Sequence, residues 1–408
     1  MWRSGFISSE RESRYLDDCL RDIELNRVLR ERAEATLRAL SIVEPVFADS
    51  LRAPQSPNHH AEGPFLADHL RLALMSLYAI LDGGLRVLDI EEFRRMRGYE
   101  GEWQELEETI RGHAATFETF ILCHDAAKWT DIFFTAPHGT RGFELGFRQS
   151  MDLLWDDAGF TERAQARRKY LDLYVAFAKE HSNETDRQIQ KEFFSAYGIK
   201  IRNAGHEKAI HSPVYRGLLE RTASARRIPD QDRDFLETLI SHHMDPLPDF
   251  GRKMDSSRMD RYAVTASHHG YDADDFIDFL QAGVFLDMVC GNIRPSFHGY
   301  WHDPTVLINF FRSEHDHSPW KREQKQKKCD EEERRHRQKL YREVGLDGVA
   351  ILELLGMEPG PTFGTLLKQI HDAVEGRRSV MPNLPPDAKK TIDERIVAYH
   401  QKTFAQGL

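Results

Sequence analysis

Several histidine and aspartate residues of this chain lie inside apolar segments, where a polar side chain without a partner is costly to bury. His124 and Asp125 end one apolar run and are followed by Lys128. His69 and Asp287 lie within two other apolar runs. A divalent cation compensates such buried groups, because it neutralises carboxylates and accepts the lone pair of an imidazole. Ordinary hydrogen bonds would explain any one of these residues, so the prediction of a metal site depends on their combination.

The combination offers two imidazoles and two carboxylates for one octahedral cation: His69, His124, Asp125 and Asp287. A mixed nitrogen and oxygen set suits manganese, iron, nickel, cobalt or magnesium better than it suits a closed structural zinc site. Three later histidines could contact a phosphate or hold a second ion: His206, His242 and His243. Asp125 would then bridge the two ions. We therefore expect one or two divalent metal ions at the site.

Such a metal ion favours hydrolytic chemistry, because it lowers the pKa of a coordinated water from about 15.7 towards about 7 and neutralises charge on phosphoryl oxygens. Lys128 or Arg227 could stabilise the phosphate. His206 or His242 could protonate the leaving oxygen. The two basic residues also have ordinary interpretations, since Lys128 could cap the C-terminal end of a helix and Arg227 could simply lie at the surface.

Helical periodicity dominates the chain, and runs of alternating β-branched residues are almost absent. The sequence therefore predicts an all-α, mainly helical protein. The helices expected to position the ligands and the later histidines span 68–81, 117–128, 213–225, 230–244 and 276–289. Residues 89–116 are predicted to be helical, charged and solvated, and residues 295–319 to form a loop rich in proline, histidine and tryptophan.

Four parts are predicted along the chain. They are an amphipathic helical extension at 1–50, a ligand-bearing helical domain at 51–300 with an insertion at about 130–204, a loop and charged helix at 301–345, and a small helical tail at 346–408. The insertion contains helical pieces at 147–155 and 163–179, without a pattern of metal ligands. The extension is expected to act as a cap or as a dimerisation element, so a homo-oligomer is one of the states the sequence allows.

Composition and charge restrict the class of protein. The chain has 408 residues, of which 40% are hydrophobic and 30% charged, as in a folded globular protein. Its net charge of −10 does not favour nucleic acid or an anionic membrane, so a polyanionic partner would need a local basic patch. The four cysteines are scattered along the chain and none of them forms a CxxC pair. This spacing predicts reduced thiols and a cytoplasmic location. No signal peptide is evident, and no apolar run reaches the roughly 18–20 residues of a membrane span.

The order of the ligands resembles the HD superfamily of metal-dependent phosphohydrolases, which has one histidine, then a His-Asp pair, later histidines and a final aspartate. The resemblance implies four metal ligands: His69, His124, Asp125 and Asp287. It also matches His206 and one of His242 or His243 to additional histidines of the family. Lys128 stands where the family often has a lysine. The resemblance implies an HD-domain helical core, and in this chain a long helical insertion is expected to extend that core.

A narrower resemblance is to the HD and C-terminal regions of bacterial CCA-adding tRNA nucleotidyltransferases. It covers pieces between residues 58 and 378, including Asn58-His59-His60-Ala61-Glu62-Gly63, Gly205-His206-Glu207, Arg226-Arg227-Ile228-Pro229 and the tail at 351–364. The nucleotidyltransferase head has no counterpart, because about 50 residues precede the domain and they lack its Gly-Ser motif and paired aspartates. CCA addition is therefore excluded. Residues 126–205, between Asp125 and His206, also exceed the usual length of the family.

The predicted function is a phosphodiesterase or phosphatase acting on nucleotide or RNA-end phosphoesters, such as a 2′,3′-cyclic phosphate or a 2′-phosphate. A hydrolase of free signalling or deoxy nucleotides is the alternative enzyme, and an inactive HD scaffold that binds nucleotide or protein is the alternative of another class. RNA binding would depend on basic residues between Lys321 and Arg337. Acidic residues at 330–333 interrupt that run, which is also typical of a solvated helix with i,i+4 ion pairs.

Overall fold

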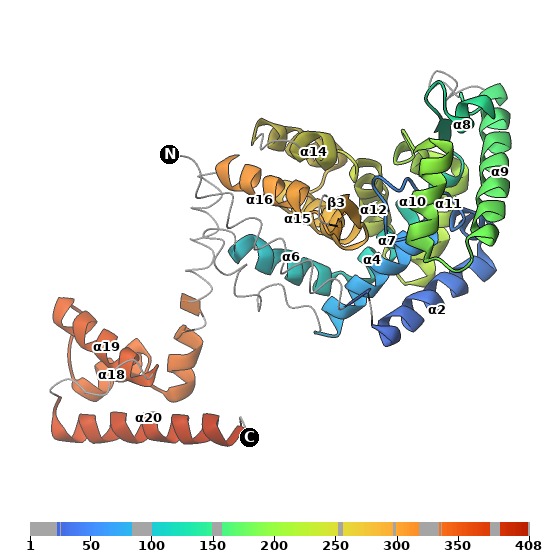
Figure 1. Ribbon diagram of the computed structural model, residues 1–408. Coiled ribbons are helices and arrows are strands. Elements are labelled where there is room, and N and C mark those ends of the chain that lie inside the picture. The colour runs from blue at the N-terminus through green and yellow to red at the C-terminus, as the bar shows by residue number, and fades with distance from the viewer. Residues whose placement is uncertain are drawn as a thin grey trace, which may run out of the picture. The chain divides into compact units, whose positions relative to one another are not determined.

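The structure is a computed structural model that describes residues 23–24, 26–83, 100–148, 157–251, 256–296, 299–317, 334–335, 337–375 and 384–406. The chain divides into two compact units, Met1–His317 and Ser318–Leu408 (Figure 1). Helices make up most of both, which confirms the predicted all-α class, and the described strands form only two small antiparallel pairs. The boundary between the units falls within the part predicted at 301–345.

The first unit is organised around helix α4 (Leu66–Leu81), which is buried along almost its whole length. It packs against α7 (Ala114–Cys123) and α6 (Glu100–Gly112). At its start, the Asp68 carboxylate accepts a hydrogen bond from the Phe65 backbone N–H at 3.1 Å. A Cβ on Gly63 would lie 2.3 Å from this carboxylate, so only glycine leaves room for the cap. The first turn of α4 is thereby held against the preceding loop.

Residues 27–50 belong to the same core and do not form a separate extension. Helices α2 (Arg27–Val43) and α3 (Pro45–Ser50) bury Leu29, Leu37 and Phe47, and α2 packs along α4. The amphipathic pattern of this segment is therefore satisfied within the chain. Residues 1–22 lie outside the described residues, so a dimerisation role for them stays a prediction.

Helix α6 differs from the solvated helix predicted at 89–116. Trp103, Leu106 and Ile110 are all buried in the main core, at i, i+3 and i+7. The Trp103 ring meets the Phe311 ring edge to face, with 5.0 Å between their centroids. The dense charges conceal this narrow apolar stripe in the sequence. Residues 89–99 of the predicted segment lie outside the described residues.

The predicted insertion folds around a small core of its own. Strands β1 (Phe133–Thr135) and β2 (Lys200–Arg202) pair antiparallel and bring its two ends together. Between them lie α8 (Arg141–Glu144), α9 (Asp157–Glu180) and α10 (Asp186–Tyr197). The helix predicted at 147–155 is not present at its first two residues, since Arg148 bridges to Thr135 in extended form. The rest of that segment lies outside the described residues.

Later helices complete the main core. Helices α11 (Pro213–Ala225), α12 (Asp230–His242), α14 (Met259–His269) and α15 (Ala273–Val284) lead into a π-helix, η6 (Phe285–Cys290). The predicted loop at 295–319 is instead the hairpin β3 (Arg294–Ser296) and β4 (Gly299–Trp301) followed by α16 (Thr305–His317). Leu307 and Phe310 of α16 are buried in the main core. This apolar face decides that α16 belongs to the first unit.

The second unit is a small helical tail. Helices α18 (Gly348–Leu355), α19 (Pro361–Val374) and α20 (Pro386–Gln406) surround buried Leu346, Ile351 and Ile370. Most of the basic run at 321–337 lies outside the described residues. In the part of the chain that the structure describes, no helix is both long and apolar enough to cross a membrane.

The burial of α6 can be tested by truncating Trp103. Its side chain is 0% exposed, so Trp103→Ala is expected to lower the free energy of unfolding by about 3–5 kcal/mol through lost burial and a residual cavity. Phe160→Ala is the control, because Phe160 is 51% exposed and its truncation should cost below about 1 kcal/mol. Urea denaturation measures both values. Equal small losses would show that α6 is solvated.

Candidate metal centre

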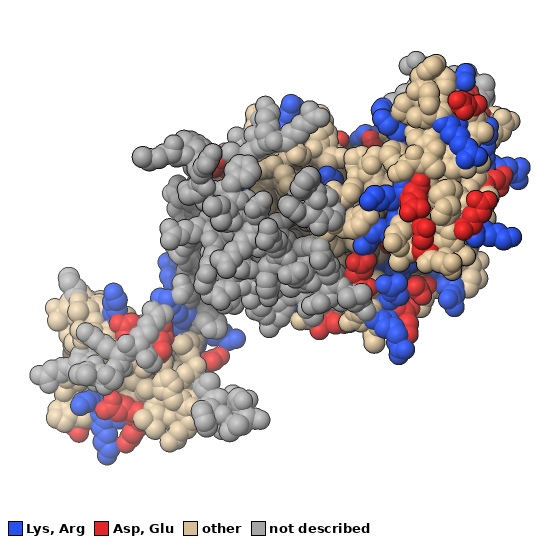
Figure 2. Space-filling view, in the orientation of Figure 1, with Lys and Arg blue, Asp and Glu red and all other residues tan. Residues whose placement is uncertain are grey.

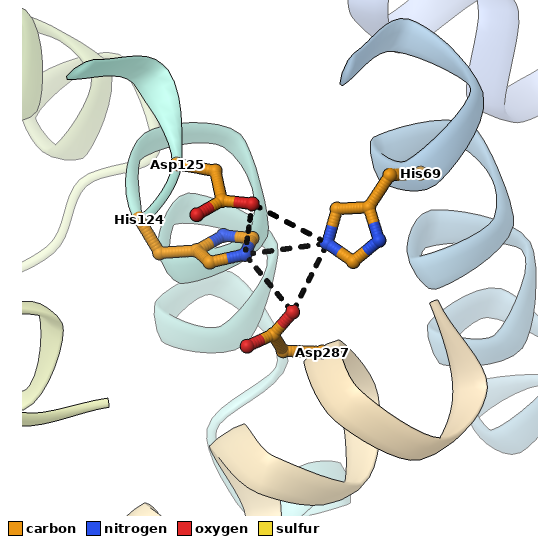
Figure 3. A group of neighbouring side chains, drawn as sticks. All are labelled: His69, His124, Asp125 and Asp287. Atoms are coloured by element: carbon orange, nitrogen blue, oxygen red, sulfur yellow. Dashed lines mark hydrogen bonds and ion pairs between the residues drawn. The ribbon is translucent and has the colours of Figure 1, made fainter. Parts of the chain in front are cut away.

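Four side chains predicted as ligands converge in the main core (Figure 3). His69 comes from α4, His124 and Asp125 follow α7, and Asp287 lies in η6. The Asp287 Oδ1 atom lies 3.0 Å from His69 Nε2 and 3.4 Å from His124 Nε2. The two Nε2 atoms are 3.5 Å apart, and Asp125 Oδ2 lies 3.6 Å from His69 Nε2. One ligand atom from each residue thus borders the same small space, at distances that a bound cation would bridge.

The backbone orients both imidazoles of this group. His69 Nδ1 donates to the Gly291 carbonyl at 2.8 Å, and His124 Nδ1 donates to the Ile121 carbonyl at 3.0 Å. These contacts place a hydrogen on Nδ1 and direct Nε2 at the carboxylates, so the Nε2 lone pair is available to a cation when the ring is neutral. A metal-ligating histidine typically has this arrangement, with its other nitrogen held by a carbonyl or carboxylate.

Asp287 reaches the group because the helix after α15 widens into a π-helix. Such a turn adds one residue relative to an α-helix, and it occurs often at functional sites. Gly291 follows this turn directly. A Cβ at that position would lie 2.9 Å from His69 Cε1, so glycine permits the ring to pack against the backbone.

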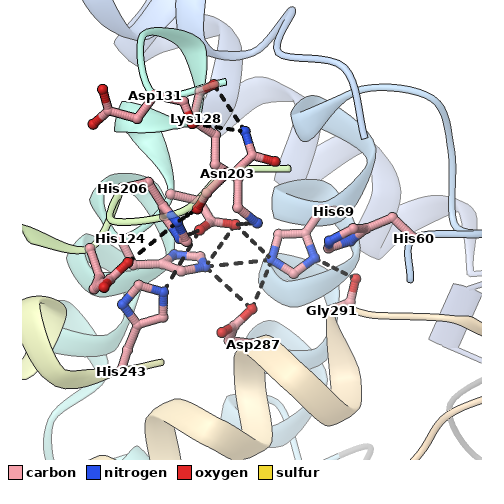
Figure 4. A network of polar contacts seen from close by, with 12 residues as sticks. His60, His69, His124, Lys128, Asp131, Asn203, His206, His243, Asp287 and Gly291 are labelled. Atoms are coloured by element: carbon pink, nitrogen blue, oxygen red, sulfur yellow. Dashed lines mark hydrogen bonds and ion pairs between the residues drawn. The ribbon is translucent and has the colours of Figure 1, made fainter. Parts of the chain in front are cut away.

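A second group of ligand atoms lies on the other oxygen of Asp125 (Figure 4). Asp125 Oδ1 is 2.9 Å from His206 Nε2 and 3.7 Å from His243 Nε2. His206 Nδ1 donates to the Asn203 carbonyl, and His243 Nδ1 donates to the Ile240 carbonyl, both at 2.6 Å. Asp125 is therefore shared between two sets of donors, in the position that a bridging ligand occupies.

These contacts bring lone pairs face to face. With the hydrogen of His206 on Nδ1, its Nε2 presents a lone pair to a carboxylate oxygen 2.9 Å away. Four buried ligand atoms lack a hydrogen bond of acceptable geometry among the described residues: both oxygens of Asp125 and the Nε2 atoms of His206 and His243. An unsatisfied buried polar group costs about 1–3 kcal/mol, and more when charged. A cation between the donors removes this cost, so the residues fit a divalent metal ion.

The carboxylates at the site are held in the charged form. Burial opposes ionisation of Asp125, but the positive charges of Lys128 and His124 hold its pKa well below its ordinary value. Burial likewise opposes ionisation of Asp287, and His124 and His69 lower its pKa in the same way. Two ionised carboxylates therefore face the cluster, as a divalent ion requires.

The same charges shift the pKa of the His69 imidazole in the opposite direction. Burial disfavours its charged form, but hydrogen bonds with Asp287 and Glu62 outweigh burial and raise its pKa to about 10. A proton thus compensates the carboxylates when no other cation does. Metal binding displaces such protons, because an imidazole ligand must be neutral.

Lys128 lies beside the cluster, as the sequence suggested. Its Nζ is 2.5 Å from Asp125 Oδ2, and the residue is buried in the 3₁₀ turn that follows α7. The ammonium group also lines a pocket next to the cluster. Its position therefore fits contact with a phosphate, and its side chain is engaged by the site instead of capping a helix.

Two residues given catalytic roles from the sequence lie away from the cluster. His242 Nδ1 contacts Asp245 Oδ2 at 2.8 Å, and neighbouring His243 takes the place beside Asp125. Arg227 is exposed, has a φ of 59°, and does not line the pocket. We correct both assignments. Helix α12 ends at His242, and this ending turns the next side chain inward.

Glu62 is a site residue that ligand reasoning missed. Its buried Oε1 lies 2.8 Å from His60 Nδ1 and 3.5 Å from His69 Nδ1, and its Oε2 accepts from the Ile293 backbone N–H at 3.0 Å. Burial opposes its ionisation, but His60 and His69 lower its pKa to about 2. Glu62 belongs to the Asn58–Gly63 motif, and this motif was the one feature of the sequence that could have indicated its role. Its contacts depend on residues far away in the chain.

Comparisons of the chain with protein-family models, with curated proteins and with solved structures found no match. The function is therefore inferred from the geometry of the site and from the order of the candidate ligands in the sequence.

The two neighbouring histidines allow a matched test of the second ligand group. His243→Ala is expected to reduce bound manganese from two ions per chain to one, because it removes a nitrogen that faces Asp125. His242→Ala should leave the metal content unchanged, since His242 contacts Asp245 instead. Elemental analysis and calorimetric titration with manganese measure the content. Loss of an ion in the His242 variant alone would contradict the assignment.

Proposed function

We propose that this chain is a metal-dependent phosphohydrolase of the HD type that hydrolyses nucleotide or RNA-end phosphoesters. One observation carries the proposal: two buried groups of ligand atoms share the Asp125 carboxylate. A structural role alone would not require four imidazole Nε2 atoms to face a buried carboxylate. The order of the ligands in the sequence supports the same function by its resemblance to the HD superfamily.

The residues divide naturally between two ions. His69, His124, Asp287 and Asp125 Oδ2 would hold the first, and His206, His243 and Asp125 Oδ1 the second. A divalent ion bound there would supply a nucleophilic water at neutral pH and would neutralise charge on the phosphoryl group. Manganese, iron, nickel, cobalt and magnesium all suit this mixed ligand set.

The remaining side chains would bind and orient the phosphoester. Lys128 Nζ lies against Asp125 and faces the pocket, so it would neutralise phosphoryl oxygens as charge develops on them. Because His206 directs its Nε2 at Asp125, we propose it as a ligand and not as the proton donor expected from the sequence. Hydrolysis consumes one water for each phosphorus–oxygen bond broken, and the leaving oxygen takes up a proton.

RNA as the substrate rests on the resemblance alone. The basic run that would contact RNA lies mostly outside the described residues. Figure 2 shows basic and acidic side chains interspersed over the part of the first unit that carries α2, α9 and α10. A mixed surface of this kind does not create the single-sign field that attracts a polyanion.

The function is tested by removing the shared carboxylate. Asp125→Asn is expected to lose bound metal and to reduce turnover of bis-p-nitrophenyl phosphate by at least about 10²–10³-fold, because both ligand groups lose a charged oxygen. Asp234→Asn, an exposed change in α12, is the matched control and should keep both properties. Elemental analysis and the release of p-nitrophenol with added divalent ions provide the measurements.

A wild-type protein that binds no metal and stays inert with every ion supplied would refute this function. An HD scaffold that binds without turnover would then be the better account. Metal-dependent turnover that persists in Asp125→Asn would instead refute the role of the shared carboxylate.

A further inference from the structure

A pocket of about 260 Å³ lies next to the candidate metal centre. Asp287 and His206, one from each ligand group, form part of its wall together with Lys128. A phosphoryl group at the metal centre would therefore place the rest of its molecule in this pocket. The volume is slightly below the roughly 300–1,000 Å³ of common small-molecule sites, so the pocket takes one compact group.

The insertion closes one side of the pocket. Ile201, Arg202 and Asn203, at its returning end, line the pocket together with the loop that carries His59 and His60. Asn203 Nδ2 donates to the Lys128 carbonyl at 3.3 Å, which attaches this wall to the metal centre. A long substrate passing straight through the site would meet the insertion.

Helix α10 of the insertion also holds the loop that carries His59 and His60. Gln190 is buried, and its Nε2 lies 3.1–3.2 Å from the carbonyls of Gln55, His60 and Gly63. Arg187 Nε donates to the Ala61 carbonyl at 2.5 Å. The insertion therefore clamps the loop across the pocket through backbone groups. Because these bonds hold both walls, the width of the pocket is a property of the folded insertion.

The inner surface of the pocket combines an apolar side with two polar groups that lack a partner. Met244, Leu247 and Met288 provide a soft apolar surface suited to a planar ring. Asn292 is only 7% exposed, and its Oδ1 has no hydrogen-bond partner among the described residues. The Nε atom of Arg294 also lacks a hydrogen-bond partner among the described residues, while its Nη1 donates to Asp303 at 3.3 Å. Both residues line the pocket, so an acceptor and a donor without a partner among the described residues belong to its wall.

Basic side chains line the pocket beside the Asp287 carboxylate. Arg294, Lys128 and His59 all line it. Burial, and then the positive charges of Arg294 and Lys128, lower the pKa of His59. Because its lowered pKa leaves His59 neutral at neutral pH, Lys128 and Arg294 are the cations of this group that an anionic ligand would meet.

We propose that this pocket binds the base and sugar of a single nucleotide, and that the insertion restricts the enzyme to free mononucleotides. The inference rests on the proposed function for the position of the phosphate. The apolar surface contacts the face of the base, and Asn292 and Arg294 bond to a polar edge that carries both a donor and an acceptor. A chain continuing beyond this nucleotide would meet the walls joined by Gln190 and Arg187.

Binding of the four unmodified nucleosides tests the pocket without any hydrolysis. At least one is expected to bind wild-type protein in calorimetric titration at millimolar concentration, with or without metal. Asn292→Ala and Arg294→Met should each weaken this binding at least tenfold, because a buried hydrogen bond is lost. Arg216→Met, which changes an exposed arginine of α11, is the matched control and should stay within twofold. A tetraribonucleotide should compete at least tenfold more weakly than the nucleoside.

Three results would overturn the inference: no nucleoside binds, the two pocket variants bind as wild type does, or the tetraribonucleotide competes equally well. Metal content of each variant shows whether the site has folded. Turnover of bis-p-nitrophenyl phosphate separates the two proposals. Metal-dependent turnover without nucleoside binding refutes the pocket alone, whereas nucleoside binding without turnover refutes the phosphohydrolase function alone.

Discussion

The Asp125 carboxylate is the constraint on which the rest of the first unit depends. It is 1% exposed, and imidazole nitrogens approach both of its oxygens. A charge buried so deeply is tolerated only with closely placed partners, and breaking such a set costs several kcal/mol. The imidazole partners come from α4, from the ends of α7 and α12 and from the turn after β2. Figure 4 shows these elements meeting around one point, so the packing of distant helices serves a single electrostatic requirement.

The irregular ends of the helices satisfy this requirement. The last carbonyls of a helix have no partner within it, and they are therefore available to other donors. His124 and His243 each follow the end of a helix, and each donates its Nδ1–H to a carbonyl of the last turn. The π-helix positions Asp287, and Gly291, which has no side chain, leaves room for the His69 ring against its backbone. Regular helices supply the scaffold, while their breaks orient the ligands.

The insertion contacts both the pocket and the candidate metal centre. Its strand pair brings Asn203 and His206 to the site, and its helix α10 holds the loop that contains Glu62. Glu62 in turn contacts His69 of the first ligand group. A segment without a ligand pattern of its own thus shapes the pocket and supports the ligands. Its small separate core explains how it can be rigid enough to do both.

The sequence by itself determined the all-α class and the four residues that meet at the candidate metal centre, because a histidine or aspartate inside an apolar helical run must be buried and compensated. His69 and Asp287 carry this signal in their immediate neighbours. Only the tertiary structure distinguished His243 from His242. The directions of adjacent side chains around a helix axis differ by about 100°, so only one of the two can face Asp125. The packing of the end of α12 decides that it is His243. The tertiary structure alone also revealed Glu62, whose partner Ile293 lies far away in the chain. Local patterns report burial, whereas the partner of a buried group is decided by contacts between distant segments.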